Sequence, residues 1–157
     1  MVLLLALNYD FSGQPNSSLT QNELAGSNNL KISNTADFTT DDYILIEPNN
    51  PSSEILKIQS ITPNTEIIFD SNMKFNHSTG VKIYKLPYNQ VKYYYCDTPT
   101  GIYTEIVSST KEMSYANIFT PYNYSTTLTG LYYKRTFYNS TTTVESDISL
   151  SDYWQTN

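Results

Sequence analysis

Short runs of apolar residues, each bounded by polar turn residues, recur at close intervals through the first half of the chain. The clearest run is 42–47, Asp-Tyr-Ile-Leu-Ile-Glu, and comparable runs occur at 30–33, 55–60, 66–70 and 81–84. Asn, Pro, Gly and Ser separate them. Runs rich in β-branched and aromatic residues between such turn residues predict short β-strands. We therefore expect 30–86 to form a small antiparallel β-barrel or sandwich.

The second half of the chain repeats the pattern with many more aromatic residues. Two strand–turn–strand units are expected here, with strands at 91–96, 102–108, 131–138 and from Val144 onward, and with turns at 97–101 and 139–142. Asp, Pro, Gly, Asn and Thr supply the turn chemistry. Two antiparallel hairpins around one core form about half of a β-sandwich. The sequence thus predicts an all-β protein with two coupled parts.

The chain begins with an apolar run at Val2–Leu7 and continues with a polar stretch that shows no periodicity. The run has no basic residues before it and no small-residue cleavage site after it, so we expect a buried β-strand rather than a secretory signal. It is also too short to span a bilayer. Residues 11–29 are expected to be a long surface connection. The resulting division is 1–29 as strand and extended arm, 30–86 as barrel module and 87–157 as sandwich with a C-terminal tail.

Charge and composition narrow the classes of partner. The net charge is −6 with nine Lys and Arg and no basic run, so no nucleic acid and no anionic membrane surface is expected as a partner. A single cysteine excludes an internal disulfide bond. The 15 tyrosines suit strand surfaces, where a ring packs while its hydroxyl stays in water.

No constellation of residues predicts an enzyme. His77 is the only histidine, and no Ser, His and Asp arrangement or metal-ligand spacing accompanies it, so a structural role is expected. Cys96 has no neighbouring Lys or His in sequence to lower its pKa. The loosely spaced carboxylates do not fit a calcium loop. We expect no catalytic residue, no metal and no cofactor.

The strand pattern of 30–86 resembles a small all-β module that recurs in phage tail and other virion proteins. The matching positions are Phe38, Asp42, Ile44, Ile46, Glu54, Ile58, Ile61, Phe69, His77, Gly80 and Val81. Asp41 stands where the module usually has Gly, so the turn before the strand is where this chain is expected to differ.

The later segment resembles the last strands of fibronectin type III domains. The resemblance lies in Asp-x-Pro-x-Gly-x-Tyr at 97–103, Tyr-Tyr-Lys-Arg-x-x-Tyr-Asn-Ser at 132–140 and Glu-Ser-Asp at 145–147. Arg135 and Thr136 stand where that family usually has aliphatic residues. A complete sandwich needs about seven strands. The missing strands come from Val2–Leu7, from the barrel, or from another chain by strand addition.

These resemblances imply a structural component of a tailed-bacteriophage virion, on the head surface as a decoration protein or in the head–tail neck. Its partners would be copies of itself and other virion proteins of the capsid, the portal or neck, or the tail. The residues expected to form interfaces are apolar or aromatic and lie near the ends of the chain or in a tyrosine-rich loop. They are Val2, Leu3, Leu4, Leu5, Tyr122, Tyr124, Tyr153 and Trp154.

Two alternatives remain open at this point. Tyrosines of the two strands, namely Tyr93, Tyr94, Tyr95, Tyr132 and Tyr138, could instead form a carbohydrate-binding surface for host adhesion on the phage tail, with weak glycan contacts. A small hydrolase would need an acidic or histidine-containing pocket, which the sequence does not indicate.

Overall fold

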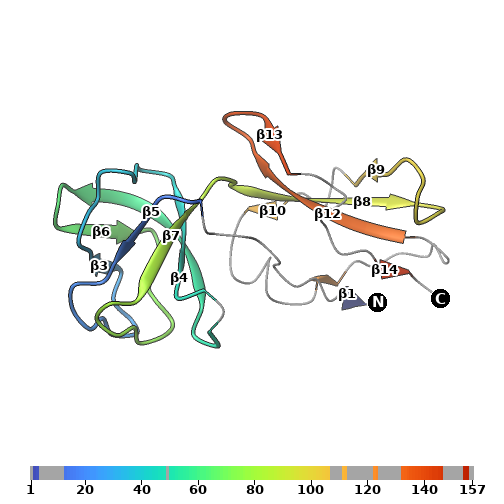
Figure 1. Cartoon of the computed structure of the whole chain (residues 1–157). Coiled ribbons are helices and arrows are strands. Elements are labelled where there is room, and N and C mark those ends of the chain that lie inside the picture. The colour runs from blue at the N-terminus through green and yellow to red at the C-terminus, as the bar shows by residue number, and fades with distance from the viewer. Residues whose placement is uncertain are drawn as a thin grey trace. The chain divides into compact units, whose positions relative to one another are not determined.

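The computed structural model is all-β, and it describes residues 2–3, 13–48, 50–106, 111–112, 122–123, 132–146 and 154–155 (Figure 1). No helix occurs within these ranges. The chain divides into two compact units, one formed by 10–87 and the other by 1–9 together with 88–157. The expected barrel or sandwich class, built from antiparallel strands, is confirmed.

The first unit contains one six-stranded antiparallel sheet. Its strands are β2 (Asn16–Ser18), β3 (Asn29–Lys31), β4 (Tyr43–Ile46), β5 (Glu54–Thr62), β6 (Glu66–Phe69) and β7 (Lys82–Leu86). They follow the order β2-β7-β4-β5-β6-β3. Each strand from β3 to β7 falls on one of the predicted apolar runs.

The two outer strands of this sheet meet and close it into a barrel. Leu19, directly after β2, forms an antiparallel bridge with Ile32, directly after β3. The backbone N–H of Thr20 donates to the carbonyl of Lys31 at 3.0 Å. Because a closed sheet has no free edge, the barrel does not offer its outer strands for pairing with other chains.

The expectation of a surface connection at 11–29 is wrong at residues 16–19, whereas most other described residues of that segment are exposed. Residues 16–18 form β2, which pairs with β7, and Glu23 forms a second bridge with His77. Ser17 and Leu19 point into the unit and are buried. The strand was missed because Asn-Ser-Ser contains no apolar residue, so backbone pairing rather than side-chain burial defines it.

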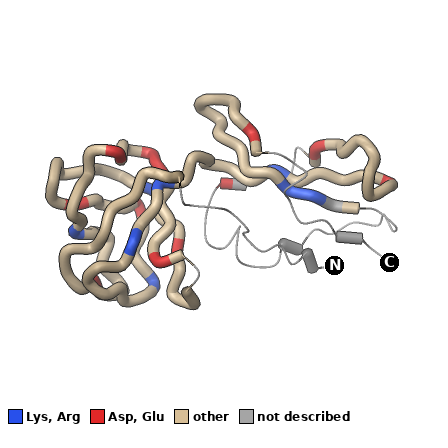
Figure 2. Tube along the Cα trace, viewed as in Figure 1, with Lys and Arg blue, Asp and Glu red and all other residues tan. Residues whose placement is uncertain are grey.

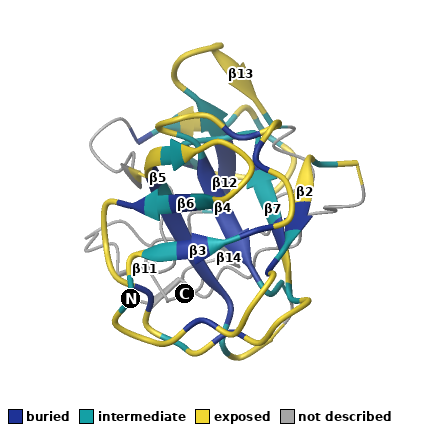
Figure 3. Cartoon of the chain, turned by 90° about the vertical axis from the view of Figure 1, so that its left-hand side faces the viewer, coloured by how far each residue is buried: buried dark blue, intermediate teal, exposed yellow. Residues whose placement is uncertain are grey.

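The barrel core is made of apolar side chains from β3 to β7 and from the segments that follow β2, β3 and β6, and Figure 3 shows many buried positions on the strands. The buried cluster consists of Leu19, Leu30, Ile32, Phe38, Ile44, Ile46, Leu56, Ile58, Ile67, Phe69, Met73 and Ile83. Full burial of one such side chain contributes about 1.5–3 kcal/mol, so this cluster dominates the stability of the unit.

The turn before β4 uses a left-handed residue. Asp41 has φ of 71°, a backbone conformation that favours glycine, and its N–H donates to the carbonyl of Ile58 at 2.9 Å. Asp tolerates this conformation better than most residues. The Asp side chain at this position is therefore compatible with a glycine-like turn.

The second unit contains another six-stranded antiparallel sheet. Its strands are β8 (Gln90–Cys96), β9 (Thr104–Glu105), β10 (Lys111–Glu112), β12 (Tyr132–Asn139), β13 (Val144–Glu145) and β14 (Trp154–Gln155). The long strands β8 and β12 pair from Cys96 opposite Tyr132 to Gln90 opposite Tyr138. The two-residue strands β9 and β10 both pair along the edge of β8 that faces away from β12. In the same way, β13 and β14 pair along the outer edge of β12.

The β8–β12 pair has one buried and one polar face. Val91, Tyr93 and Phe137 are buried on one face, and the guanidinium carbon of Arg135 lies 5.4 Å from the Phe137 ring centre. Thr136, on the other face, is also buried. Thus Arg135 and Thr136 are core positions although their residue types are polar.

The first predicted hairpin of this unit is shorter than expected. Its second strand is reduced to β9, residues 107–108 lie outside the described part, and Ile102 is 94% exposed. The preceding turn is tight, because a Cβ atom on Gly101 would lie 2.5 Å from the Cys96 sulfur. The hydroxyl of Tyr103 donates to the Pro99 carbonyl at 3.2 Å and holds the loop closed over 99–103.

The N-terminal strand belongs to the second unit. β1 (Val2–Leu3) pairs with β11 (Tyr122–Asn123) in a separate two-stranded antiparallel sheet. It does not join the larger sheet of that unit through the described pairings. Residues 4–7 of the predicted strand lie outside the described residues.

Candidate functional site

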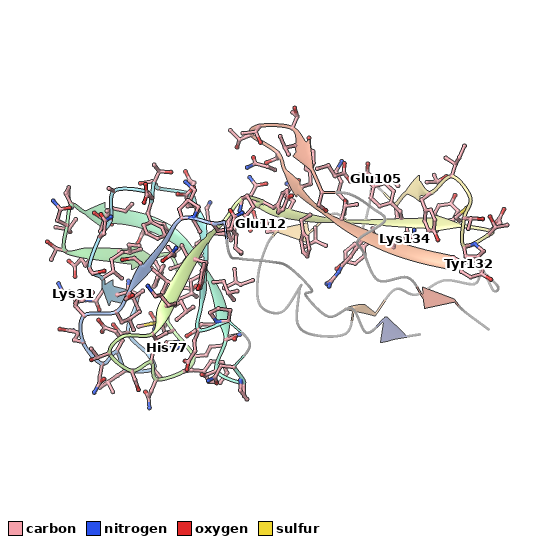
Figure 4. The ribbon with its side chains drawn as sticks, viewed as in Figure 1. Lys31, His77, Glu105, Glu112, Tyr132 and Lys134 are labelled. Atoms are coloured by element: carbon pink, nitrogen blue, oxygen red, sulfur yellow. The ribbon has the colours of Figure 1, made fainter. Side chains whose placement is uncertain are left out.

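The only histidine, His77, lies in the barrel, in the segment between β6 and β7 (Figure 4). Each of its ring nitrogens contacts a carboxylate. Its ring is fully buried. Nδ1 lies 3.0 Å from Glu47 Oε2, and Nε2 lies 2.8 Å from Glu54 Oε1. We call Glu47, His77 and Glu54 the histidine triad.

Glu54 is the buried member of the pair of carboxylates. It begins β5, and its side chain is 2% exposed. Its second oxygen, Oε2, accepts the backbone N–H of Lys74 at 2.9 Å. Both oxygens of this buried carboxylate therefore have a donor, as a buried charge requires.

Glu47 directly follows β4 and is more accessible, with 24% of its side chain exposed. Its carboxylate also accepts from Asn50 Nδ2 and from Ser52 Oγ, both at 2.9 Å. Its backbone φ is 53°, in the left-handed region that a residue with a Cβ seldom adopts. The carboxylate thus connects the ring of His77 to the turn at residues 50–53.

The backbone of His77 is fixed by the segment that follows β2. His77 and Glu23 exchange backbone hydrogen bonds at 2.8 and 3.0 Å. The Glu23 side chain is buried too, and its Oε1 accepts the backbone N–H of Lys31 at 2.8 Å. The main chain of His77 is consequently held by the bridge to Glu23, and its ring is held by Glu47, which follows β4, and Glu54, which begins β5.

The geometry of the histidine triad favours a charged ring when both carboxylates are ionised. A neutral imidazole has one N–H, whereas an ionised carboxylate only accepts hydrogen bonds, so two carboxylates on the two nitrogens call for an imidazolium. Burial of the ring opposes the charged form, but the hydrogen bonds to Glu54 and Glu47 outweigh it and raise the pKa of His77 above its usual value.

In this arrangement both nitrogens of His77 are engaged and neither faces solvent, so the ring has no free nitrogen for a substrate or a metal. Among the residues that the structure describes, no group of three or more His, Cys, Asp or Glu side chains is placed to hold a metal ion. The triad is suited to joining three chain segments through charge.

Sequence reasoning missed the partners of His77. The resemblance included Glu54 and His77 as separate positions, and Glu47 closes the apolar run at 42–47, but nothing in the sequence joined the three. A buried polar residue directly after an apolar strand was the available signal, because buried carboxylates need partners.

A second charged group lies in the other unit, on the polar face of β8 and β12. Lys92 Nζ lies 3.3 Å from Glu105 Oε2 and 3.6 Å from Glu145 Oε2, and it sits 3.9 Å from the centre of the Tyr138 ring. We call Lys92, Glu105 and Glu145 the lysine cluster. Acidic and basic residues are interspersed along the described chain in Figure 2.

Two hydroxyl groups also donate hydrogen bonds to the Glu145 carboxylate. The hydroxyls of Tyr94 and Thr136 both donate to Glu145 Oε1. Burial raises the pKa of Tyr94, and the hydrogen bond to the Glu145 carboxylate raises it further. For Glu145 itself burial acts upward, but the hydrogen bonds from Thr136 and Tyr94 and the charge of Lys92 lower its pKa overall.

The predicted interface residues divide between described and undescribed parts of the chain. Leu4, Leu5, Tyr124 and Tyr153 lie outside the described residues. The other four lie in short strands: Val2 and Leu3 in β1, Tyr122 in β11 and Trp154 in β14. β1 and β11 pair with each other, with Leu3 opposite Tyr122, and Trp154 lies opposite Tyr133 of β12.

The remaining surface features are modest. Leu24, Ile102 and Val144 are the exposed large apolar residues among those described, and single exposed residues of this kind are common. Residues 35–40 and 61–64 line a shallow, open groove at the barrel surface. Cys96 is half-buried with a free thiol.

No known protein family, curated protein or solved structure matches this chain. The described residues include no helix long and apolar enough to cross a membrane.

Proposed function

We propose that the protein is a non-enzymatic structural component of a tailed-phage virion, located on the head surface or in the head–tail neck. It acts by assembly, in multiple copies, through β-strand pairing and aromatic contacts. Its partners are copies of itself and the capsid, portal, neck or tail proteins around it.

The observation that carries the proposal is the placement of the residues that resemble the virion module. The Asp42 carboxylate accepts from the backbone N–H of Thr39 at 2.7 Å and pairs with Lys85 at 2.7 Å, which fixes the start of β4. Glu54 and His77 form a buried ion pair. Gly80 has φ of 86°, which only glycine adopts without strain.

The apolar members of the same set lie in the barrel core or pack against it. They are Phe38, Ile44, Ile46, Ile58, Ile61, Phe69 and Val81. The resemblance therefore involves positions on which this fold depends, and not a chance sequence of surface residues. This placement is consistent with the resemblance on which the proposal rests.

The second unit supports an assembly role in a different way. Its described outer strands are two residues long, and two exposed apolar residues lie at these edges: Val144 in β13 and Ile102 two positions before β9. Exposed apolar residues at a sheet edge favour contact with a neighbouring chain.

The contacts of the tyrosines do not favour the carbohydrate-binding alternative. Tyr93 is buried, Lys92 covers one face of the Tyr138 ring, and Lys134 Nζ lies 4.6 Å from the centre of the Tyr103 ring. A sugar that stacks on the lysine-covered face of Tyr138 or Tyr103 would have to displace that lysine. We therefore advance the structural role alone.

The proposal is tested on purified particles of the phage whose genome encodes the chain. Quantitative mass spectrometry of the particles should find the chain in a fixed ratio to the major capsid protein, and labelling with an antibody in electron microscopy should place it at the head or neck. Absence of the chain from washed particles would overturn the proposal. Sedimentation of the isolated chain then shows whether it associates with itself.

A further inference from the structure

The two carboxylates of the histidine triad are not equivalent. Glu54 is almost completely buried and has only the ring of His77 and the Lys74 backbone N–H as its donors in the contacts above. Glu47 is partly in solvent and has two further donors, Asn50 and Ser52. Moving the Glu47 carboxylate into water therefore costs little free energy. Exposing the Glu54 carboxylate, or leaving it buried without a donor, costs much more.

Loss of one proton from the ring creates a conflict with one of the two carboxylates. The remaining N–H of a neutral imidazole can serve only one of them, and the other nitrogen presents a lone pair to a carboxylate oxygen about 3 Å away. The N–H is retained on Nε2, because the buried Glu54 cannot be hydrated. The bare nitrogen is then Nδ1, which faces Glu47.

We propose that the contact between His77 and Glu47 is a charge-dependent latch, which holds the 50–53 turn against the barrel while the ring is charged and releases it when the ring loses its proton. The contact between His77 and Glu54 stays closed in both states.

The local backbone is suited to this movement. Glu47 has a left-handed φ of 53°, so release of its side chain allows the residue to leave a conformation that is costly for a non-glycine residue. The turn that follows is held by its own short-range hydrogen bonds, including Ser53 N–H to the Asn50 carbonyl at 2.9 Å. Asn50 and Ser52 also bind the Glu47 carboxylate, so its release removes the contact that orders the turn and loosens these bonds as well.

Three other titratable residues contact the triad, and the contacts described here are made by their backbone groups. Glu23 pairs with the main chain of His77, Lys74 donates its backbone N–H to Glu54, and the Lys82 carbonyl accepts the backbone N–H of Glu47 at 3.0 Å. The ring itself faces Glu47 and Glu54. A change of charge at His77 is therefore felt first by these two carboxylates.

The direction of the pH dependence follows from the closed state, in which the charged ring is favoured. The latch is closed at acidic and neutral pH and opens as the pH rises through the raised pKa of His77. Between the pKa of the open form and that of the closed form, each pH unit increases the opening equilibrium about tenfold.

The experiment is nuclear magnetic resonance on the full chain between about pH 6 and pH 9, a range that extends above the ordinary histidine pKa. The nitrogen shifts of the single histidine report its charge and tautomer. In the same samples, amide hydrogen exchange is measured and corrected for its intrinsic pH dependence. The exchange of the Ser52 and Ser53 amides of the turn is compared with that of the Lys74 amide, which donates to Glu54.

We expect His77 to titrate to the tautomer with the proton on Nε2, and protection of the turn amides to fall about tenfold or more while that of Lys74 is kept. A flat response of the turn while His77 titrates would overturn the proposal. So would a ring that stays charged over the whole range, a neutral ring with its proton on Nδ1, or loss of protection at Lys74 first.

A matched pair of variants separates the latch from general effects of pH. The Gln side chain of Glu47→Gln can accept from a protonated Nδ1 or donate to a bare one, so the pH response of the turn should disappear while His77 still titrates. Glu66→Gln removes a carboxylate of the same unit that pairs with Lys31, and it should keep the response. An unchanged response in Glu47→Gln would contradict the latch, and the wild-type comparison of Ser53 with Lys74 stands even where a variant folds poorly.

Discussion

Each unit of the protein holds a cation between two glutamates, but water reaches the two groups to different degrees. In the histidine triad of the barrel the ring is fully buried, and one carboxylate is 2% exposed. In the lysine cluster of the second unit the lysine is 15% exposed and both carboxylates are 30% exposed. The same arrangement of charges therefore has a different physical meaning in each unit.

The difference shows how burial decides what an ion pair does. A buried pair gains little net stability over an apolar pair, but removal of one partner leaves a charge without solvent or partner. A half-exposed pair is screened by water, and its loss is partly compensated by hydration. Histidine is also the side chain whose ordinary pKa lies closest to neutral pH, and here that pKa is raised. The pKa of Lys92, although burial opposes it, is raised above its already high usual value by Glu105 and Glu145.

The largest expected effect is in Glu54→Ala. This substitution leaves the buried His77 charge and the Lys74 backbone N–H without their acceptor, and it should destabilise the barrel by about 3–5 kcal/mol. Urea titration followed by amide resonances of β4 and β5 measures the change in the barrel alone. A loss below about 1 kcal/mol would mean that the triad is hydrated and equivalent to a surface pair.

A smaller effect is expected from raising the pH on the wild-type protein. Because the pKa of His77 is raised in the folded state, its stabilising contribution is complete below the unfolded value of about 6.5 and is lost as the pH rises through the folded value. The free energy of unfolding of the barrel should fall in alkaline solution, and His77→Gln should remove this dependence. A stability of the barrel that rises with pH would contradict the sign.

Removing one carboxylate from the lysine cluster should cost much less than the corresponding change in the barrel. Glu145→Ala should destabilise the second unit by about 1 kcal/mol or less, measured by amide exchange of β8 and β12. The pKa of Glu145 is lowered, so its contribution is present at neutral pH and is lost as the pH falls through the folded value. A cost as large as that of Glu54→Ala would erase the distinction between the two clusters.

The smallest effect is expected at the exposed turn of the barrel. Asp41→Gly relieves the left-handed backbone but removes an ion pair with Lys57 at 2.8 Å. The Asp41 side chain is 75% exposed. These changes oppose each other, so the stability of the barrel should stay within about 0.5 kcal/mol of the wild type. Thermal unfolding measures it, and a larger loss would show that exposed pairs of the barrel also contribute substantially.

The longer strands could be predicted from the sequence, and several of the short ones could not. Apolar runs such as Tyr43–Ile46 mark strands because their side chains fill the core, and β4 is buried at all four positions. The three residues Asn16–Ser18 and the two-residue strands β10 and β14 carry no apolar period, so only backbone pairing with distant segments defines them. Such pairing depends on the tertiary fold.

The site was predictable only in part, for a similar reason. His77 could be assigned a structural role because no catalytic partner accompanies it in the sequence. Its actual partners lie 30 and 23 positions away, and the register of β4, β5 and β7 brings them to the ring. A one-residue shift in that register would turn these side chains to the opposite face.

The way the barrel is connected bears on the order in which the chain acquires its structure. The Lys85 N–H donates to the Pro15 carbonyl at 2.9 Å, so the barrel's entry and exit are neighbours once β2 has paired with β7. The pairing of β1 with β11 spans this whole segment, and closing so long a loop in an unstructured chain carries an entropic cost. A barrel that is already folded shortens that loop to its closed ends. During synthesis all strands of the barrel are available once β7 has left the ribosome. The N-terminal strand β1 can pair only after β11 has been made as well.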